Sequence, residues 1–189
     1  MLETKRQHII PTSIQREALM ALSHYPELKN TAIEFRFKEQ IDKSIMQAQP
    51  SFLSLFRSKK NRKYYILISK TFEIEGKKYS TIHIPENVMI GWLGHELGHV
   101  MDYKERSSLN LIWFGLNYYF SDDAIKEAER AADTYAVHKN MDSYILETKN
   151  FILNNTNLSD SYKNRIKKYY LSPDEIMILV EKRDQSKNN

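Results

Sequence analysis

The residues of this chain best suited to chemistry are those of the segment His95-Glu96-Leu97-Gly98-His99. On an α-helix, residues four apart lie on one face, so the imidazoles of His95 and His99 can bind one metal ion together. Zinc is the metal we expect, because imidazole suits it and a catalytic zinc site leaves one coordination position open for water. Glu96 lies beside this face, where its carboxylate can take a proton from a water whose pKa zinc lowers to about 7. The alternative is a buried helix that carries two incidental histidines.

The helix that would position these side chains is predicted over 87–103, after an extended segment that ends at Pro85. One face of it carries the apolar residues expected to enter the core, Met89, Leu93, Leu97 and Val100. Between this face and the histidines lie three glycines, Gly91, Gly94 and Gly98. Each glycine costs about 1 kcal/mol of helix propensity relative to alanine, so their clustering predicts that another element packs closely there.

A catalytic zinc needs a third protein ligand, and two sequence patterns can supply it. The first is a histidine six residues after His99, but Glu105 stands at that position. The second is a glutamate on a later helix, and the helix predicted over 121–140 carries Glu129. We therefore assign Glu129 as the third ligand. Asp133 lies one turn further on the same side, where we expect it to accept a hydrogen bond from a metal-bound histidine.

The two motifs, HELGH at 95–99 and ERAAD at 129–133, resemble those of the gluzincin metallopeptidases. The resemblance is greatest to the HtpX/CAAX-protease family and its small soluble relatives, the minigluzincins, and it covers roughly residues 64–140. It implies a zinc peptidase in which the Zn²⁺ ligands are His95, His99 and Glu129 and the general base is Glu96. The residue that stabilises the oxyanion has no match in these motifs, and the candidates are Tyr103, Tyr135 and His138.

The function we expect is that of a zinc-dependent endopeptidase, which hydrolyses peptide bonds of a peptide or protein substrate with a metal-activated water. The alternative is a regulatory or binding module that keeps the zinc site, contacts a protein or nucleic acid, and has little or no proteolytic activity. The basic run 57–63 would then be the contact surface, although a solvated loop is the simpler interpretation of such a run. A third hypothesis is a membrane-associated regulator, which rests on the apolar segment 109–120.

The composition is that of a mildly basic protein with one domain. A chain of 189 residues is long enough for one core and short for two, and a net charge of +4 does not by itself indicate nucleic acid. The absence of cysteine excludes disulfides and fits a reducing compartment. No secretory signal or transmembrane helix is evident, so we expect a cytoplasmic protein, with peripheral membrane contact as an option.

The segments before the motif predict a helix and a small twisted sheet. Residues 12–24 have helical periodicity, and 31–38 alternate between apolar and charged residues as a half-buried strand does. Residues 41–56 have a helical pattern that Pro50 interrupts. Residues 64–68 are apolar throughout, which predicts a central strand, and 71–84 read as a hairpin around Gly76.

The second arm of this hairpin, 77–84, leads into the zinc helix and resembles the edge strand that borders a gluzincin active site. Backbone groups at a free strand edge can bind an extended peptide by strand addition. Along this arm Tyr79, Thr81 and His83 are expected to face outwards, and Ile82 and Ile84 to face the core.

The segment 109–120 lies between the two metal-binding helices and is almost wholly apolar. Its 12 residues are too few to span a bilayer, which takes about 20. Three interpretations remain: a core helix, a hydrophobic wall of the substrate cleft, or an interfacial contact with a membrane.

The C-terminal part is predicted to be helical, with a strong helix start at Ser172-Pro173. It is expected to pack on the catalytic core, or to cover the cleft as an intramolecular inhibitory segment. Altogether the sequence predicts an α+β, zincin-like metallopeptidase fold with a small twisted sheet, an HExxH helix and a mainly helical C-terminal part. The division we expect is a zincin-like catalytic domain, 1–140, and a helical extension, 141–189, packed on the same domain.

Overall fold

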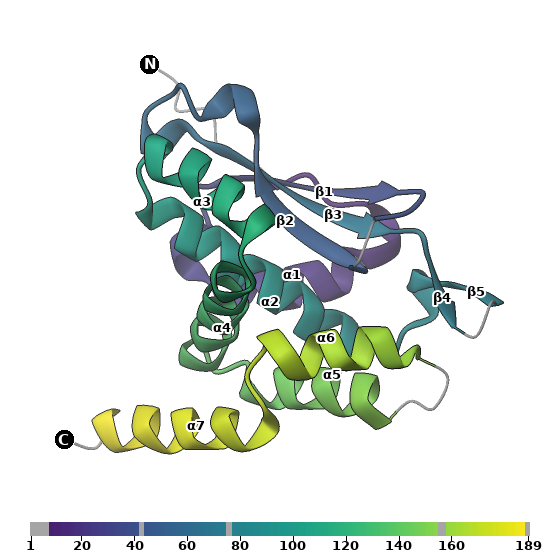
Figure 1. Ribbon diagram of the computed structural model, residues 1–189. Coiled ribbons are helices and arrows are strands. Elements are labelled where there is room, and N and C mark those ends of the chain that lie inside the picture. Colours follow the sequence, from purple (N-terminus) through teal and green to yellow (C-terminus); the bar gives the residue numbers. More distant parts are fainter. Residues whose placement is uncertain (1–7, 42–43, 75–76, 155–157, 188–189) are drawn as a thin grey trace.

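The computed structural model describes residues 8–41, 44–74, 77–154 and 158–187 of the chain. It is an α+β fold, mostly helical, with a sheet of three strands in the order β1-β3-β2 (Figure 1). The strands are β1 (Ala32–Lys38), β2 (Met46–Pro50) and β3 (Lys63–Ser69). β1 runs parallel to β3, and β2 runs antiparallel to it. The α+β class and the small sheet are therefore confirmed.

The centre of the sheet is β3, as its apolar run predicts. Its buried residues Tyr64 and Ile66 pair with Ile33 and Phe35 of β1, which are buried as well. Two helices pack beneath the sheet, α1 (Gln15–Ser23) and α2 (Glu86–Glu105) (Figure 1). A short 3₁₀ turn, Thr12–Ile14, precedes α1. The helix and the strand expected at 12–24 and 31–38 are therefore confirmed.

The prediction of a helix over 41–56 is wrong, because this segment contains the strand β2. Methionine, glutamine and alanine all favour helices, so the local composition of this segment is misleading. In the structure Met46 and Ala48 pair with Ile68 and Ile66 of β3, and both are buried there. Pro50, which has no N–H to donate, occupies the last position of the strand. Pairing with β3 and burial against α2 therefore override the intrinsic helix propensity.

The hairpin predicted at 71–84 is confirmed for its first part, as β4 (Thr71–Ile74) and β5 (Lys77–Ser80) form a separate two-stranded sheet. Gly76 lies outside the described residues. After Ser80 the chain turns into a 3₁₀ segment, Thr81–His83, which ends the alternation of the strand. Thr81 is consequently buried, with its hydroxyl donating to the Ser69 carbonyl oxygen at 2.5 Å, whereas Ile82 is exposed. The orientations expected for these two residues are therefore wrong.

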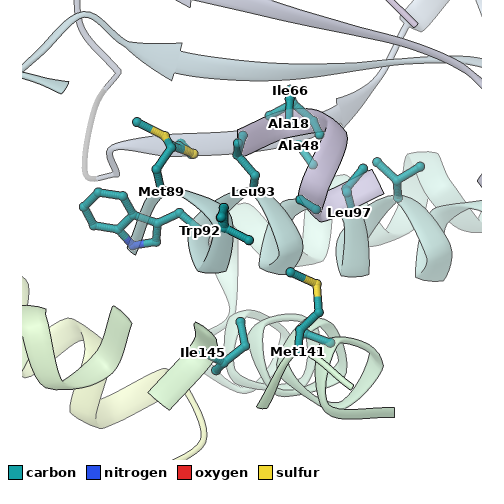
Figure 2. Packing of buried hydrophobic residues seen from close by; sticks show 14 of the residues in the cluster. Ala18, Ala48, Ile66, Met89, Trp92, Leu93, Leu97, Met141 and Ile145 are labelled. Carbon is teal, nitrogen blue, oxygen red and sulfur yellow. The ribbon is translucent and has the colours of Figure 1, made fainter. Parts of the chain in front are cut away.

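The central helix of the fold is α2, which covers the predicted span 87–103. Met89, Leu93 and Leu97 are buried and point towards α1 and the sheet, where Ala18 and Ile66 lie (Figure 2). Met141 and Ile145 lie on the opposite side of α2 in the same view, so the helix is covered on both sides (Figure 2). The predicted core face is confirmed.

The glycines of α2 let two helices touch its backbone, α4 (Asp122–His138) and α5 (Asp142–Asn154). A Cβ atom placed on Gly98 would lie 2.5 Å from the carbonyl oxygen of Ala132 in α4. One placed on Gly91 would lie 2.4 Å from the carbonyl oxygen of Tyr144 in α5. The predicted close packing is therefore confirmed, and it sets the distance between the helices that carry His99 and Glu129.

We expect Gly98→Ala to destabilise the protein, because the added methyl group meets backbone atoms of Ala132 that no rotamer change can move. The cost of overpacking, about 1–3 kcal/mol, outweighs the gain of about 1 kcal/mol in helix propensity. The matched control is Gly115→Ala, since a Cβ atom there meets nothing within 4 Å. Thermal unfolding should show a lower Tm for the first variant and an equal or higher Tm for the second. A Gly98→Ala protein as stable as its parent would contradict this account of the helix contact.

Part of the basic run 57–63 is structural, because two of its members cap the C-terminal end of α2. The buried guanidinium of Arg62 donates to the carbonyl oxygens of Tyr103 and Arg106, at 3.3 and 2.7 Å. Lys59 donates to the carbonyl oxygen of Glu105 at 2.7 Å. Cations at this end also interact favourably with the helix dipole.

The remaining helices are α3 (Ser108–Phe120), α6 (Asp160–Tyr169) and α7 (Pro173–Lys187). Ser121 caps α4 as predicted, since its hydroxyl accepts from the amide of Ala124. Ser172 and Glu175 cap α7 reciprocally, each side chain accepting from the amide of the other residue. None of the helices in the described ranges is long and apolar enough to cross a membrane. The domain boundary at residue 140 stays a prediction.

Candidate metal centre

The contact between α2 and α4 brings three side chains of metal-ligand type together. Nε2 of His95 lies 3.0 Å from Oε2 of Glu129, and Nε2 of His99 lies 3.2 Å from the same oxygen. One ligand atom from each of the three residues lies within 4.8 Å of the others. All three side chains are buried. The structure therefore assembles the ligand set predicted from the sequence, and this group could hold a metal ion.

The two nitrogen–oxygen distances are close to those around a tetrahedral metal ion, and all the ligand atoms lie within 4.8 Å of one another. Zn–N and Zn–O bonds of about 2.0–2.1 Å place neighbouring ligand atoms of a tetrahedron about 3.4 Å apart. The two distances from Glu129 are only slightly shorter, at 3.0 and 3.2 Å. Two imidazoles and one carboxylate also form a donor set that zinc accepts in catalytic sites.

Asp133 fixes the orientation of the His95 ring through a hydrogen bond to Nδ1. Nδ1 of His95 lies 2.8 Å from Oδ1 of Asp133, so a proton on Nδ1 donates to the carboxylate and leaves Nε2 free as a ligand atom. The other carboxylate oxygen, Oδ2, accepts from the ammonium of Lys149 at 2.8 Å and from the backbone amide of Leu171 at 3.0 Å. The role predicted for Asp133 thus has its expected geometry, and Lys149 and Leu171 complete it.

The buried charges in this group balance one another. Burial alone would raise the pKa of Glu129, but the two imidazoles hold it well below its ordinary value. Burial likewise opposes ionisation of Asp133, whose pKa is nevertheless lowered by Lys149 and His95. Despite its own burial, the pKa of His95 is raised to about 10 by hydrogen bonds to Asp133 and Glu129. Lys149 balances the charge of Asp133 and a protonated His95 balances that of Glu129, so a bound metal ion would take the place of the His95 proton.

Glu96 lies beside the ligand atoms but outside the ligand set. Its Oε2 accepts a hydrogen bond of 2.6 Å from the backbone amide of Ala48, in the middle of β2. Burial raises the pKa of the Glu96 carboxyl above its ordinary value. The position predicted for a general base is therefore adjacent to the metal-ligand group, and strand β2 holds it.

A cleft of about 680 Å³ opens over Glu96, His99 and Glu129. One wall is β2, from Met46 to Pro50, which is an edge strand of the three-stranded sheet. The opposite wall is the inner face of α3, formed by Leu111, Phe114, Gly115 and Tyr118. Arg165 of α6 and Tyr170 after it complete the lining. One face of 109–120 lines this cleft, with Leu111 in the hydrophobic core, while the other face is exposed, so the segment is not a wholly buried helix.

The strand expected to border the site lies away from the cleft. Tyr79, Thr81 and His83 do not line the cleft, and β5 pairs only with β4 among the described strands. The strand beside the metal-ligand group is β2, which lies earlier in the chain. The helical pattern of 41–56 gives no indication that β2 is a strand, so the sequence could not place β2 beside the site.

Only one of the three oxyanion candidates lines the cleft. The ring of Tyr103 stacks on that of His99, with centroids 5.9 Å apart, and its hydroxyl lies 3.4 Å from the Ala48 carbonyl oxygen. Tyr135 and His138 are not among the cleft residues, and His138 is exposed. Tyr118, which the sequence did not single out, donates to Oε1 of Glu129 at 2.5 Å.

Three further groups at the site were missed, Lys149, Tyr170 and the Leu171 amide. The sequence does indicate Lys149, because this lysine lies in the same helical stripe as Ile145 and Ile152. A lysine buried in an apolar stripe needs an acidic partner. Tyr170 lies against the ring of His95, with centroids 5.2 Å apart, and the ammonium of Lys149 lies 4.7 Å from the Tyr170 ring centroid. Nothing in the local sequence indicates either Tyr170 or the amide that follows it.

The resemblance to gluzincins rests on the segments 95–99 and 129–133, which lie in contact across α2 and α4. The cleft, the ligand geometry and the hydrogen bonds to the ligands are described from the structure of this chain itself. No family model matches the chain, and comparisons with curated proteins and with solved structures give no match.

Proposed function

We propose that this chain is a zinc-dependent endopeptidase with a zincin-like fold. The observation that carries the proposal is the meeting of His95, His99 and Glu129 beside the carboxylate of Glu96, at a cleft that Glu96, His99 and Glu129 line. Structural zinc sites are closed by four protein ligands, whereas this group offers three and borders a cleft. Such an arrangement is typical of a site at which the metal also meets water and substrate.

A zinc ion held by these three residues would supply a Lewis acid for the scissile carbonyl group and lower the pKa of a water. Glu96 would accept the proton of that water and then donate it to the leaving amine. A raised pKa suits both tasks, because a carboxyl group that titrates nearer to neutral pH accepts and releases a proton more evenly. The Ala48 amide holds Oε2, and we assign Oε1 to the proton transfer.

The walls of the cleft suit an extended peptide. The outer edge of β2 faces the cleft. The Ala48 amide binds Glu96, so a substrate strand would pair with the other backbone groups of this edge. The apolar inner face of α3 would contact substrate side chains across the cleft. For the oxyanion we propose Tyr103, because it lines the cleft and its hydroxyl makes only a long contact of 3.4 Å to the Ala48 carbonyl oxygen, whereas the Tyr118 hydroxyl donates to Glu129.

The regulatory alternative has less support. The contact surface expected for it is the basic run 57–63, but Arg62 of this run is buried and binds backbone carbonyl groups at the end of α2. The inhibitory role of the C-terminal part stays a prediction. Removing this part would also remove the Leu171 amide from Asp133, so truncation is not a clean test of latency.

The proposal is tested by metal analysis and a peptidase assay on the full chain. Protein purified without chelator should contain close to one zinc per chain and cleave members of a fluorogenic peptide library. A chelator should abolish cleavage, and added zinc should restore it. Protein without bound metal, after incubation with zinc, would contradict the site. Bound zinc without cleavage would instead favour the regulatory module.

A further inference from the structure

A surface of large apolar side chains lies beside the cleft, on the outside of the protein. On α3 its members are Leu109, Ile112, Trp113, Leu116 and Phe120. On the turn after β2 they are Phe52, Leu53 and Phe56. We call these eight residues the apolar rim; their exposed fractions range from 40% to 81%. A contiguous apolar surface of this kind marks an interaction site more often than a free surface.

The helix α3 is apolar on both sides. The residues that line the cleft recur at helical spacing, from Leu111 to Tyr118. The residues of the rim recur at the same spacing on the opposite side, from Leu109 to Phe120. A helix that is hydrophobic all round belongs in apolar surroundings, and the described part of the chain covers only the inner side.

The two parts of the rim are fixed to each other. The hydroxyl of Ser108, at the start of α3, donates to the carbonyl oxygen of Leu55 at 2.6 Å. Arg62 donates to the same hydroxyl at 2.9 Å and to the end of α2. Leu55 and Leu111 are both buried in the core, and α3 lies beside the segment that follows β2 (Figure 1). The rim is therefore a built surface.

The charged residues next to the apolar rim indicate which kind of partner would bind there. Neither 51–56 nor 108–120 contains a charged residue, and Arg57 and Lys59 follow the first of these segments. Both side chains are exposed, and Lys59 binds a carbonyl oxygen, which leaves its charge in place. These cations lie towards the N-terminal end of α3, whereas the acidic residues Asp122 and Asp123 follow its C-terminal end.

Aromatic and aliphatic side chains bordered by cations match the headgroup region of a negatively charged bilayer. We propose that the apolar rim docks this protein on the surface of an anionic lipid bilayer, with α3 lying in the interface. The cleft would then open close to the membrane, and its substrate would be a membrane-adjacent protein segment; this last consequence rests on the proposed peptidase function.

The chain carries its own reporter of this contact. It has two tryptophans, Trp92 with 8% exposed and Trp113 of the rim with 63% exposed. Titration of the full chain with vesicles of phosphatidylcholine and phosphatidylserine should shift the tryptophan emission to shorter wavelength, and the protein should sediment with the vesicles. Binding should weaken with phosphatidylcholine alone and with added salt, because the cations then contribute less. Trp113→Phe should remove the spectral shift and retain sedimentation.

The rim variant Trp113→Ser with Leu116→Ser should lower the vesicle partition coefficient by at least about tenfold. Its Tm should stay near that of the parent, because both side chains are exposed. The matched control is Leu19→Ser with Ile82→Ser, which removes two apolar side chains of comparable exposure elsewhere and should bind vesicles as the parent does.

The proposal is overturned if the parent does not sediment with anionic vesicles or if the rim variant binds them as well as the parent. A concentration-dependent dimer that the rim variant abolishes would also overturn it and assign the rim to a second copy. Since no peptidase activity is measured, these outcomes do not depend on the proposed catalytic function.

Discussion

Replacing Glu96 with glutamine is expected to lower the rate of peptide hydrolysis by about 10²- to 10⁴-fold, the usual contribution of a general base. Glutamine keeps the size of the side chain, and its amide oxygen can accept the same hydrogen bond from Ala48. It cannot take a proton from water. Zinc content should stay unchanged, because His95, His99 and Glu129 are untouched. The measurements are kcat/KM on the best library peptide and the zinc content of the same preparation.

Glu86→Gln is the matched control for this experiment, since Glu86 lies at the exposed start of the same helix. This variant should retain both activity and zinc. If the Glu96 variant were as active as the parent, another group would have to act as the base. If it lost zinc together with activity, the effect would be on the metal-ligand group, and the assigned proton transfer would be unsupported.

The second large effect is expected for Glu129→Ala, which should lose most of the bound zinc. Two imidazoles remain in this variant, and a catalytic zinc site needs three protein ligands. The loss should exceed that of Asp133→Ala, for which we expect about 10- to 100-fold in metal affinity, because Asp133 acts only through His95. Zinc affinity is measured by competition with a chromophoric chelator.

Glu127→Ala controls for the loss of a carboxylate from α4, since Glu127 is exposed on the same helix. Thermal unfolding of the metal-free forms separates binding from folding, and a folded Glu129 variant without zinc is the expected result. Full zinc retention in Glu129→Ala would show that a different residue completes the ligand set.

The sequence predicted those site residues that recur at helical spacing on α2 and α4. His95 and His99 are one turn apart, as are Glu129 and Asp133, and each pair shares one face of its own helix. The glycines of α2 predicted close packing against another helix, and α4 is one of the helices found there. The need of zinc for a third ligand then linked the two helices.

The strand beside the site could not be predicted in the same way. Residues 46–50 are rich in helix-forming residues, and only pairing with β3 makes them a strand. A short strand with one proline has too few alternating positions to reveal itself by periodicity. The hairpin 71–84 has the stronger pattern, and its position before α2 made it the more plausible neighbour of the site. The strand conformation of 46–50 therefore depends on pairing with the distant strand β3, which the local sequence pattern does not reveal.

The contact of the Leu171 amide with Asp133 has a consequence for how the protein is made. The site uses segments from Ala48 to Leu171, so most of the chain must leave the ribosome before every contact exists. At ordinary rates of translation the first and last of these residues are separated by on the order of ten seconds. In about the last third of that interval, after Glu129 and before Leu171, the three ligand residues are already synthesised, while Asp133 still lacks the amide that holds it. A nascent chain would therefore present its ligands to cellular zinc before the orientation of His95 is secured, and the final affinity would be reached only when the residues after α6 dock.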